Sequence, residues 1–398
     1  MAKIAILGFG TVGSGVYEVL CRNAASVSRR AGEPVEVKYI LDPKDFTGNP
    51  VEPLVVKSID VILQDPEIRV VVETIGGVGA AYEYTRRCLM AGKHVVTANK
   101  QLVAEHGCEL LELARKNHVN YLFEASVGGG IPILHPLTQC MAANRVEEVY
   151  GILNGTTNFI LTKMVKEGAS FADVLKLAQE KGYAEADPTA DVEGIDAGRK
   201  ICILADLAFG HQVNPEKVPM EGITKLDLKD VEIAGRHGFR IKLLGRCLRL
   251  EGNRRTAYVA PHLIPMDNPI SDVNDVFNAV VVRGNATGEV MFYGKGAGEL
   301  PTASACVADV MECVQENRFR PEISWSADEG GFVSPLELKG RWYFRIDAPA
   351  EQVQPLAGKA AMLEEGRDTV LITEPITGQE AEALEKKLPV LARLRVLD

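Results

Sequence analysis

The chain begins with a short apolar run that leads straight into three spaced glycines, Lys3-Ile4-Ala5-Ile6-Leu7-Gly8-Phe9-Gly10-Thr11-Val12-Gly13. The apolar run predicts a buried strand, and apolar residues follow at helical spacing through Cys21. A strand, a glycine turn and a helix in this order are the arrangement that binds a dinucleotide. The alternative is a glycine turn that binds nothing. The expected cofactor contacts in the turn are Gly8, Phe9, Gly10, Thr11, Val12 and Gly13.

The composition is that of an ordinary globular chain of 398 residues, 46% of them hydrophobic, which is long enough for two or three domains. A formal net charge of −10 without any basic tract argues against nucleic acid or a membrane surface as a partner. No apolar run is long enough to span a membrane, and the early first strand leaves no room for a signal peptide. Without a span or a signal peptide, we expect a cytoplasmic location. The eight cysteines lack metal-ligand spacing, so we expect reduced thiols.

Strand-like and helical runs alternate through the first third of the chain, which predicts an α/β fold of Rossmann type with a doubly wound parallel sheet. We expect further strands at 35–41, 70–73, 94–98 and 121–124. Ligands bind beyond the carboxyl ends of such strands, where Thr74 and Lys100 stand. A lone cation at this edge suits a carboxylate or a phosphate. Lys100 is therefore a candidate site residue, and Thr74 is a candidate cofactor contact.

The second strand ends at Leu41-Asp42-Pro43-Lys44, where a dinucleotide-binding fold chooses between NAD and NADP. An acid at this position bonds the ribose hydroxyls and repels the additional phosphate of NADP, whereas a base accepts that phosphate. Asp42 therefore favours NAD, and the neighbouring Lys44 weakens this preference.

A second domain, of α+β type, begins beyond residue 130, where the alternation changes. An acidic loop leads there into a helix expected over 194–209, and Asp196 and Lys200 stand four residues apart on one face of that helix. A lysine beside a carboxylate in a cleft can pass a proton to a substrate oxygen if burial lowers its pKa. The alternative is an ordinary surface ion pair, worth about 0.3 to 0.5 kcal/mol.

Glycines return at Gly294-Lys295-Gly296-Ala297-Gly298, just before a helix expected over 303–315. Small residues at a helix start let a phosphate or a nicotinamide approach, which makes Gly298 a candidate cofactor contact. The alternative is a plain glycine-rich connector. Strands expected at 257–263, 279–284 and 288–293 supply a sheet for the second domain.

Together these segments closely resemble homoserine dehydrogenase over residues 1 to about 335. The matching pieces are the glycine loop and the segments 97–100, 124–132, 154–158, 182–200 and 296–302. The resemblance implies reversible hydride transfer between L-homoserine and NAD or NADP, with L-aspartate 4-semialdehyde on the oxidised side, in the biosynthesis of threonine, methionine and isoleucine. It also implies a homodimer or an assembly of the tetramer-of-dimers type.

On the matching positions, the resemblance makes Lys200 the general acid and base at the substrate oxygen and Asp196 the residue that orients it. Lys100 would help to place the substrate and the nicotinamide. Glu185 and Asp191 would bind the amino and hydroxyl ends of homoserine. Carboxylates suit an ammonium group on chemical grounds as well.

The segment from Glu124 to Ile131 resembles the family's loop for a monovalent cation, expected to be sodium. By similarity the ligands are the Glu124 carboxylate and the main-chain carbonyls of Val127, Gly129 and Ile131. Hard oxygen ligands suit a hard cation. The resemblance implies a structural ion rather than a catalytic one.

We expect a dinucleotide-binding domain over 1–130, with 296–335 packing back on it, and a substrate-binding, catalytic and dimerisation domain over 131–295. The tail, 337–398, resembles a shortened ACT-type module with a small ferredoxin-like fold. It lacks the usual glycine-bearing turn after its first strand, and one element is expected to be missing, so inhibition by threonine does not follow. No kinase domain is expected ahead of the glycine loop.

Two other functions compete with this interpretation. Aspartate-semialdehyde dehydrogenase needs a nucleophilic cysteine, and no cysteine here stands in a loop before a helix with a basic neighbour. A nucleotide-sensing or scaffold protein could keep the fold and lose catalysis. The joint presence of Lys100, Glu185, Asp196 and Lys200 argues against that second alternative.

Overall fold

Six parallel strands form the first sheet in the computed structural model, which describes residues 1–315, 323–328 and 330–398. They are β1 (Ala2–Leu7), β2 (Val35–Leu41), β3 (Val55–Val56), β4 (Ile68–Glu73), β5 (His94–Thr97) and β6 (Tyr121–Leu122). Their order in the sheet is β3-β2-β1-β4-β5-β6, the doubly wound order of dinucleotide-binding domains. The predicted Rossmann-type fold is confirmed.

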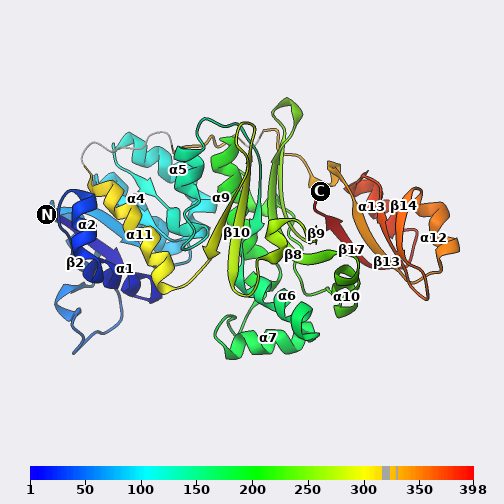
Figure 1. Cartoon of the computed structure of the whole chain (residues 1–398). Helices are drawn as coiled ribbons and strands as arrows, with labels where there is room; N and C mark the ends of the chain where they lie inside the picture. Colours follow the sequence, from blue (N-terminus) through cyan, green and yellow to red (C-terminus); the bar gives the residue numbers. More distant parts are fainter. Residues whose placement is uncertain (316–322, 329) are drawn as a thin grey trace. The chain divides into compact units, whose positions relative to one another are not determined.

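Helices cover both faces of this sheet, which explains why β1 and β4 are almost continuously apolar. One layer contains α1 (Thr11–Arg22), α2 (Ala24–Ala31) and α11 (Glu299–Val314). The other contains α3 (Ile59–Gln64), α4 (Gly79–Met90) and α5 (Lys100–Lys116). Figure 1 shows α11 beside α1, although the two helices are far apart in the sequence, and apolar residues of both enter one core.

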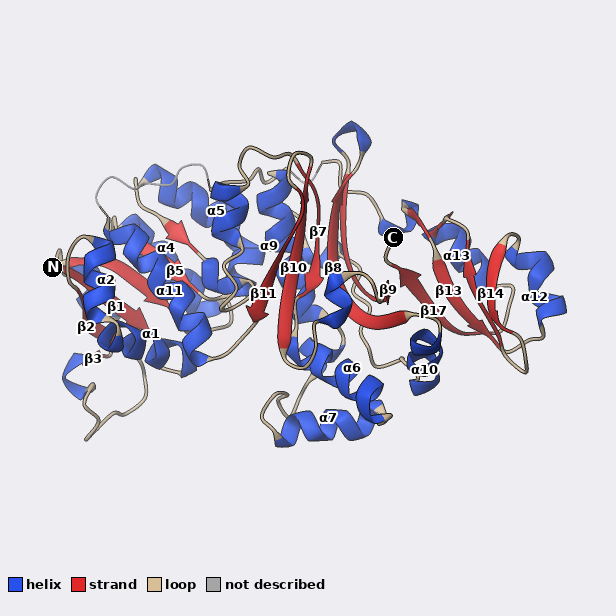
Figure 2. Ribbon diagram, in the orientation of Figure 1, coloured by secondary structure: helices blue, strands red, loops and turns tan. Residues whose placement is uncertain are grey.

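The second sheet has nine strands and is antiparallel except for one parallel pair (Figure 2). Five strands precede the tail: β7 (Val146–Ile152), β8 (Phe239–Arg249), β9 (Arg255–Pro265), β10 (Phe277–Gly284) and β11 (Gly288–Lys295). The three strands expected here correspond to β9, β10 and β11. The helices of this part are α6 (Gly155–Glu167), α7 (Phe171–Glu180), α8 (Thr189–Val192), α9 (Ile195–Phe209) and α10 (Leu228–Arg236).

The tail contains β13 (Trp342–Ile346), α12 (Ala350–Ala357), β14 (Ala360–Glu364), β15 (Thr369–Thr373), α13 (Gly378–Glu385) and β17 (Val390–Val396). These six elements make a complete βαββαβ unit of ferredoxin-like type, so the element expected to be missing is present. The strand that the sequence does not reveal is β14, whose residues are only partly buried and which is fixed by pairing with β15. The sheet order β11-β10-β7-β8-β9-β17-β13-β15-β14 joins the tail to β9 through β17. A short additional pair is formed by β12 (Lys339–Gly340) and β16 (Ile376–Thr377).

The chain divides into two units. The first contains residues 1–145, 202–215 and 294–329, and the second contains 146–201, 216–293 and 330–398. The first unit holds the parallel sheet, and the second holds the nine-stranded sheet with its tail. The domain boundaries drawn from the sequence stay a prediction. Within the described residues, no helix is both long and apolar enough to cross a membrane.

Candidate active site

Asp196 and Lys200 lie on one face of α9 and form a buried ion pair. Lys200 Nζ lies 2.7 Å from Asp196 Oδ2 and donates another hydrogen bond to Leu153 O at 2.8 Å. Only 8% of the Lys200 side chain and 7% of the Asp196 side chain are exposed. A buried charge is costly unless it is paired, whereas an exposed pair contributes little. The alternative of an ordinary surface ion pair is therefore excluded.

Asn154 joins this pair to the acidic loop. It follows β7 and caps α6, because its Oδ1 accepts a hydrogen bond from Thr157 N at 2.9 Å. Its Nδ2 donates to Asp196 Oδ2 at 2.9 Å and to Asp191 Oδ1 at 2.7 Å. The sequence assigned no role to Asn154. A helix N-cap residue directly after a strand is the signal that could have found it.

Asp191 lies beside the pair, whereas Glu185 does not. Asp191 is half-buried in α8, and burial raises the pKa of its carboxyl, while the hydrogen bond from Asn154 acts in the opposite direction. Glu185 is exposed, and its main-chain carbonyl accepts a hydrogen bond from Gln179 Nε2 at 3.1 Å. The structure thus brings Asp191, Asp196 and Lys200 together and leaves the Glu185 side chain in solvent.

The glycine loop between β1 and α1 has a backbone conformation and close contacts that disfavour residues with a Cβ atom. Gly8 has a φ of +86°, in the left-handed region that favours glycine. A Cβ atom on Gly13 would lie 2.1 Å from Gly8 O, so the helix start contacts the turn directly. Thr74 Oγ1 donates to Gly8 O at 2.7 Å and ties the end of β4 to this loop. The geometry fits the roles predicted for all three residues.

Asp42 uses both carboxylate oxygens to accept hydrogen bonds from the main chain. Phe9 N donates to Oδ2 at 2.7 Å, and Lys44 N donates to Oδ1 at 2.8 Å. Lys57 Nζ donates to the main-chain carbonyls of Asp42, at 2.9 Å, and of Lys44. Lys57 was not singled out in the sequence, although its position directly after β3 places it at the same edge of the sheet. The end of β2 thus carries one buried acid and two exposed lysines.

Lys100 and Gly298 both belong to the first unit. Lys100 is the first residue of α5 and is partly exposed. Gly298 precedes α11, and Glu299 Oε1 lies 3.2 Å from Ser14 Oγ, which brings the start of α11 to the start of α1. Lys200 and its partners belong to the second unit. The structure therefore groups Lys100 with the cofactor loops, and it groups Lys200 with the acidic side chains.

The Glu124 carboxylate accepts three main-chain hydrogen bonds, at 2.6 Å from Ile133 N, 3.0 Å from Leu134 N and 2.6 Å from His135 N. Burial raises the pKa of Glu124, and these donors act against that shift by favouring the charged form. They also use the oxygens that were expected to bind a cation. The other expected ligands, Val127, Gly129 and Ile131, are buried in the same loop. Among the described residues, no cluster of His, Cys, Asp and Glu side chains could hold a metal ion.

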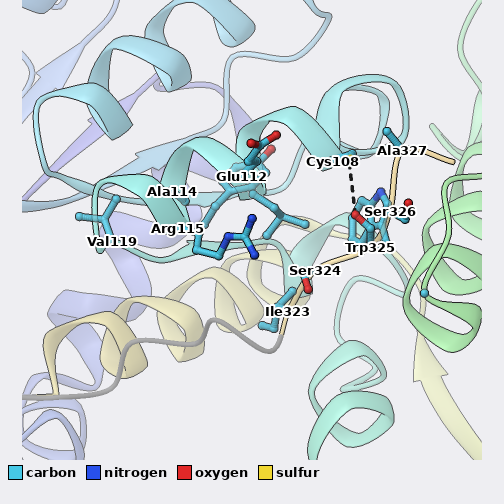
Figure 3. A pocket seen from close by; sticks show the side chains of 13 residues that line it. Cys108, Glu112, Ala114, Arg115, Val119, Ile323, Ser324, Trp325, Ser326 and Ala327 are labelled. Carbon is cyan, nitrogen blue, oxygen red and sulfur yellow. Dashed lines mark hydrogen bonds between the residues drawn. The ribbon is translucent and has the colours of Figure 1, made fainter.

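A cavity of about 480 Å³ in the first unit lies apart from all of these residues (Figure 3). Its lining includes Cys108, Arg115 and Trp325, and Cys108 Sγ donates a hydrogen bond to Trp325 O at 3.2 Å. The cavity reaches Tyr121, where β6 begins, whereas ligands of such sheets bind where the strands end. None of the predicted site residues lines it, so it is not a candidate active site.

Comparison with known families identifies both parts of the chain. Residues 8–124 match the family model described as the NAD-binding domain of homoserine dehydrogenase, and residues 132–311 match the one described as homoserine dehydrogenase. The chain belongs to the homoserine dehydrogenase family. The NAD-binding match includes the glycine loop, Asp42, Thr74 and Lys100, and the second match includes Asp191, Asp196 and Lys200.

Homoserine dehydrogenases from several organisms are similar over most of their length. The one from Pseudomonas aeruginosa is 43% identical and is aligned over 100% of this chain and 92% of its own. That from Bacillus subtilis is 45% identical over 88% of this chain and 82% of its own. The crystal structure of a homoserine dehydrogenase from Thiobacillus denitrificans has 37% identity and a TM-score of 0.91, covering 100% of this chain and 98% of that one. A hyperthermophilic archaeal homoserine dehydrogenase in complex with NADPH has 28% identity and a TM-score of 0.66, covering 78% and 97%.

Homoserine dehydrogenases are oxidoreductases that use a nicotinamide cofactor, so the predicted enzyme class and reaction are confirmed. The two competing functions, aspartate-semialdehyde dehydrogenase and a sensor without catalysis, are wrong. Three buried cysteines agree with this outcome, because burial raises the pKa of Cys88 to about 12 and also raises the pKa values of Cys306 and Cys313. Such thiols stay protonated and are poor nucleophiles.

Proposed function

We propose that Lys200 is the general acid and base of the homoserine dehydrogenase reaction in this protein and that Asp196 holds it in place. The observation that carries this proposal is the buried Lys200–Asp196 pair, which Asn154 connects to Asp191. A proton-transfer group must be held within hydrogen-bond reach of the reacting oxygen. The contacts to Asp196 and to Leu153 O fix the position of Lys200 Nζ in this way.

A bound nicotinamide would supply the hydride acceptor for the oxidation of L-homoserine and the hydride donor for the reverse reaction. In the oxidation of L-homoserine, the neutral amine form of Lys200 takes the proton of the hydroxyl group and becomes the ammonium form, while the hydrogen on the same carbon leaves as hydride and the aldehyde of L-aspartate 4-semialdehyde forms. In the reduction, Lys200 gives a proton to the aldehyde oxygen. Asp196 keeps Lys200 Nζ at the same position in both directions.

Three further side chains bind and place the substrate. Asp191, next to the catalytic pair, and Glu185, on the exposed loop between α7 and α8, bind the amino and hydroxyl ends of homoserine. A carboxylate suits the ammonium group, because hydrogen bonds between charged groups are roughly twice as strong as neutral ones. Lys100, at the start of α5, helps to place the substrate and the nicotinamide.

The cofactor binds along the glycine loop, beside Thr74 and Gly298, with its adenosine ribose at the end of β2. Asp42 gives NAD a slight advantage, because its buried negative charge lies where the additional phosphate of NADP would bind. Lys44 and Lys57 reduce this advantage, since they add two positive charges at the same place. The archaeal relative in complex with NADPH supports the use of NADP as well as NAD.

A monovalent cation, sodium by preference, is held by the main-chain carbonyls of Val127, Gly129 and Ile131. Glu124 fits this site as a source of negative charge rather than as a direct ligand, because three N–H groups already bond its carboxylate. Hard main-chain oxygens suit such an ion. In this arrangement the cation stabilises the loop and takes no part in the reaction.

The enzyme works as a homodimer or as a tetramer of dimers. Strand β11 is an edge of the nine-stranded sheet, and it exposes Met291 by 41% and Tyr293 by 55%. A second copy that pairs with this edge would cover both side chains and the open strand.

We also assign a role to each domain. Residues 1–130, supported by 296–335, bind the cofactor, residues 131–295 carry catalysis and dimerisation, and residues 337–398 have an ACT-like role. Reduced cysteines suit a cytoplasmic location.

The test of cofactor use is a steady-state assay with L-homoserine at mildly alkaline pH and either NAD or NADP. We expect turnover with both, and a somewhat higher kcat/KM with NAD. Replacing Lys57 by Ala should raise the ratio of NAD to NADP efficiency by about tenfold, because one charge–phosphate contact is lost. Lys38→Ala is the matched control, since Lys38 is a lysine of β2 that pairs with Asp65 and Glu67 instead. An unchanged ratio in Lys57→Ala would contradict the proposed role of Lys57.

A further inference from the structure

Glu73 is a fully buried carboxylate at the edge of the first sheet where the cofactor loops lie. It is the last residue of β4, and in the parallel register it stands beside Thr97, the last residue of β5. Neither residue has any exposed surface. Burying a carboxylate is costly unless it is hydrogen-bonded, and burial indeed raises the pKa of Glu73. A carboxylate buried at this edge therefore needs hydrogen-bond donors that stabilise it.

The contacts of Glu73 fix the direction of a chain of hydrogen bonds. Thr97 Oγ1 donates to Glu73 Oε2 at 2.6 Å, and Ile75 N donates to Glu73 Oε1 at 2.7 Å. Both partners donate, so they favour the ionised form of Glu73 and act against the rise in its pKa that burial causes. Thr97 Oγ1 in turn accepts a hydrogen bond from Asn99 N at 2.9 Å.

Asn99 carries this chain to the start of α5. Its Oδ1 accepts a hydrogen bond from Leu102 N at 3.1 Å and so caps the helix, while its Nδ2 donates to Gly77 O at 2.5 Å. One buried carboxylate is thereby connected to the loop after β4 and to the first turn of α5. That turn begins with Lys100.

Lys100 stands at a position that local helix energetics do not favour. The N-terminal end of a helix carries partial positive charge, which disfavours a cation there, and the first turn of α5 contains no acidic residue. Glu73 is connected to this helix start through Thr97 and Asn99, and in its ionised form it offsets this effect. The same contacts limit the ways in which the first turn can move.

We propose that Glu73 and Thr97 are positioning residues, which hold the first turn of α5 and its Lys100 in the geometry needed for homoserine turnover. The inference rests on the role of Lys100 in the proposed function. Glu73 acts through the Thr97 hydroxyl, and Thr97 acts through the main chain of Asn99. Neither residue has to touch the substrate or the cofactor.

The test compares three threonine variants. Thr97→Val removes the hydroxyl at nearly constant volume, and Thr97→Ser keeps it. Thr85→Val is the matched control, because Thr85 is also fully buried in the first unit and its hydroxyl has no hydrogen-bond partner among the described residues. We expect Thr97→Val to lower kcat with L-homoserine about tenfold or more, while the Kd for the reduced cofactor, measured by fluorescence, changes less than about twofold. Thr97→Ser should restore most of the rate, and Thr85→Val should match the unchanged protein.

The inference is overturned if Thr97→Val and Thr85→Val have the same kcat, or if cofactor affinity falls in proportion to the rate. If Thr97→Val does not fold, Glu73→Gln provides a second test. This substitution replaces the carboxylate of Glu73 with an amide of the same size, and we expect it to lower kcat in the same way. Lys100→Ala distinguishes a failure of the role proposed for Lys100 from a failure of the positioning role of Glu73 and Thr97. If Lys100→Ala keeps its rate, the role proposed for Lys100 fails. If Lys100→Ala loses its rate while Thr97→Val does not, only the positioning inference fails.

Discussion

Three charged side chains meet near the start of α9, and their surroundings differ. Lys200 and Asp196 are buried and paired, whereas Asp191 is half-buried and its carboxyl has a raised pKa. A stabilising contact normally lowers the pKa of a carboxyl group. A raised pKa beside a buried pair is therefore typical of a group kept for binding or catalysis.

Asp191→Asn should separate stability from substrate binding. Because the folded-state pKa of Asp191 is raised, the charged form disfavours the folded state, and this penalty grows as the pH rises through the raised pKa. The Asn side chain keeps an oxygen for Asn154 Nδ2. We expect the variant to unfold at the same or a higher temperature at neutral pH and to raise KM for L-homoserine about tenfold or more. A lower unfolding temperature together with an unchanged KM would contradict the assignment.

At the scale of secondary-structure elements, the cap of α6 has two tasks. Asn154 satisfies the helix start through Thr157 N, and it also bonds Asp191 and Asp196. The cap of α7 offers a comparison, because Ser170 accepts a hydrogen bond from Asp173 N and has no contact to the Lys200–Asp196 pair.

Removing either cap should lower stability, but only one should affect turnover. We expect Asn154→Ala and Ser170→Ala each to lower the free energy of unfolding by about 0.5 to 2 kcal/mol. Asn154→Ala should also lower kcat by about tenfold or more, since the Lys200–Asp196 pair, proposed to be catalytic, loses a fixed partner. Urea unfolding and steady-state kinetics on both variants measure these effects. Equal kcat values in the two variants would show that Asn154 is only a helix cap.

The elements that could be predicted are those with a strong local pattern. The apolar run of β1 and its glycines predicted the strand, turn and helix, because few structures other than a tight turn suit that spacing. Strand β8 was not predicted, because Arg240, Lys242 and Arg246 interrupt the pattern of its apolar residues. Helix α11 begins at Glu299, earlier than expected, because Pro301 lies in the first turn, where proline is tolerated.

The candidate site was predictable only where its residues are close in the sequence. Asp196 and Lys200 share a helix face, so their spacing already predicted the contact. The bonds of Asn154 join residues 37 and 42 positions apart, and Glu73 meets Thr97 across 24 positions. Such contacts depend on how strands and helices are placed, which local patterns do not determine.

At the scale of the whole molecule, the tail is part of the second unit and shares its sheet. β17 pairs with β9, and Arg345 of β13 binds Asp230 of α10 through Nε at 2.8 Å and Nη2 at 2.9 Å. Tyr343 Oη donates to the same carboxylate at 2.8 Å. These contacts are buried, so the tail is joined to the rest of its unit by a sheet and by a paired charge.

Arg345→Met should therefore destabilise the second unit strongly. Removing one partner of a buried ion pair leaves the other charge unpaired, and we expect a loss of about 3 to 5 kcal/mol in the free energy of unfolding. Arg341→Met is the matched control. Arg341 pairs with Asp398 at the surface, where such a pair is worth about 1 kcal/mol or less. Urea unfolding followed by circular dichroism distinguishes the two variants, and equal losses would show that the Arg345 contact does not hold the tail.

The most direct test of the account is the rate of L-homoserine oxidation by Lys200→Ala, followed by the absorbance of the reduced nicotinamide. Lys116→Ala is the control, since Lys116 forms an exposed pair of the same spacing with Glu112. We predict that Lys200→Ala loses about a hundredfold or more in kcat, as expected for a general acid and base, while it still binds the cofactor. A Lys200→Ala protein that turns over within about twofold of the Lys116→Ala control would contradict the assignment of proton transfer to Lys200.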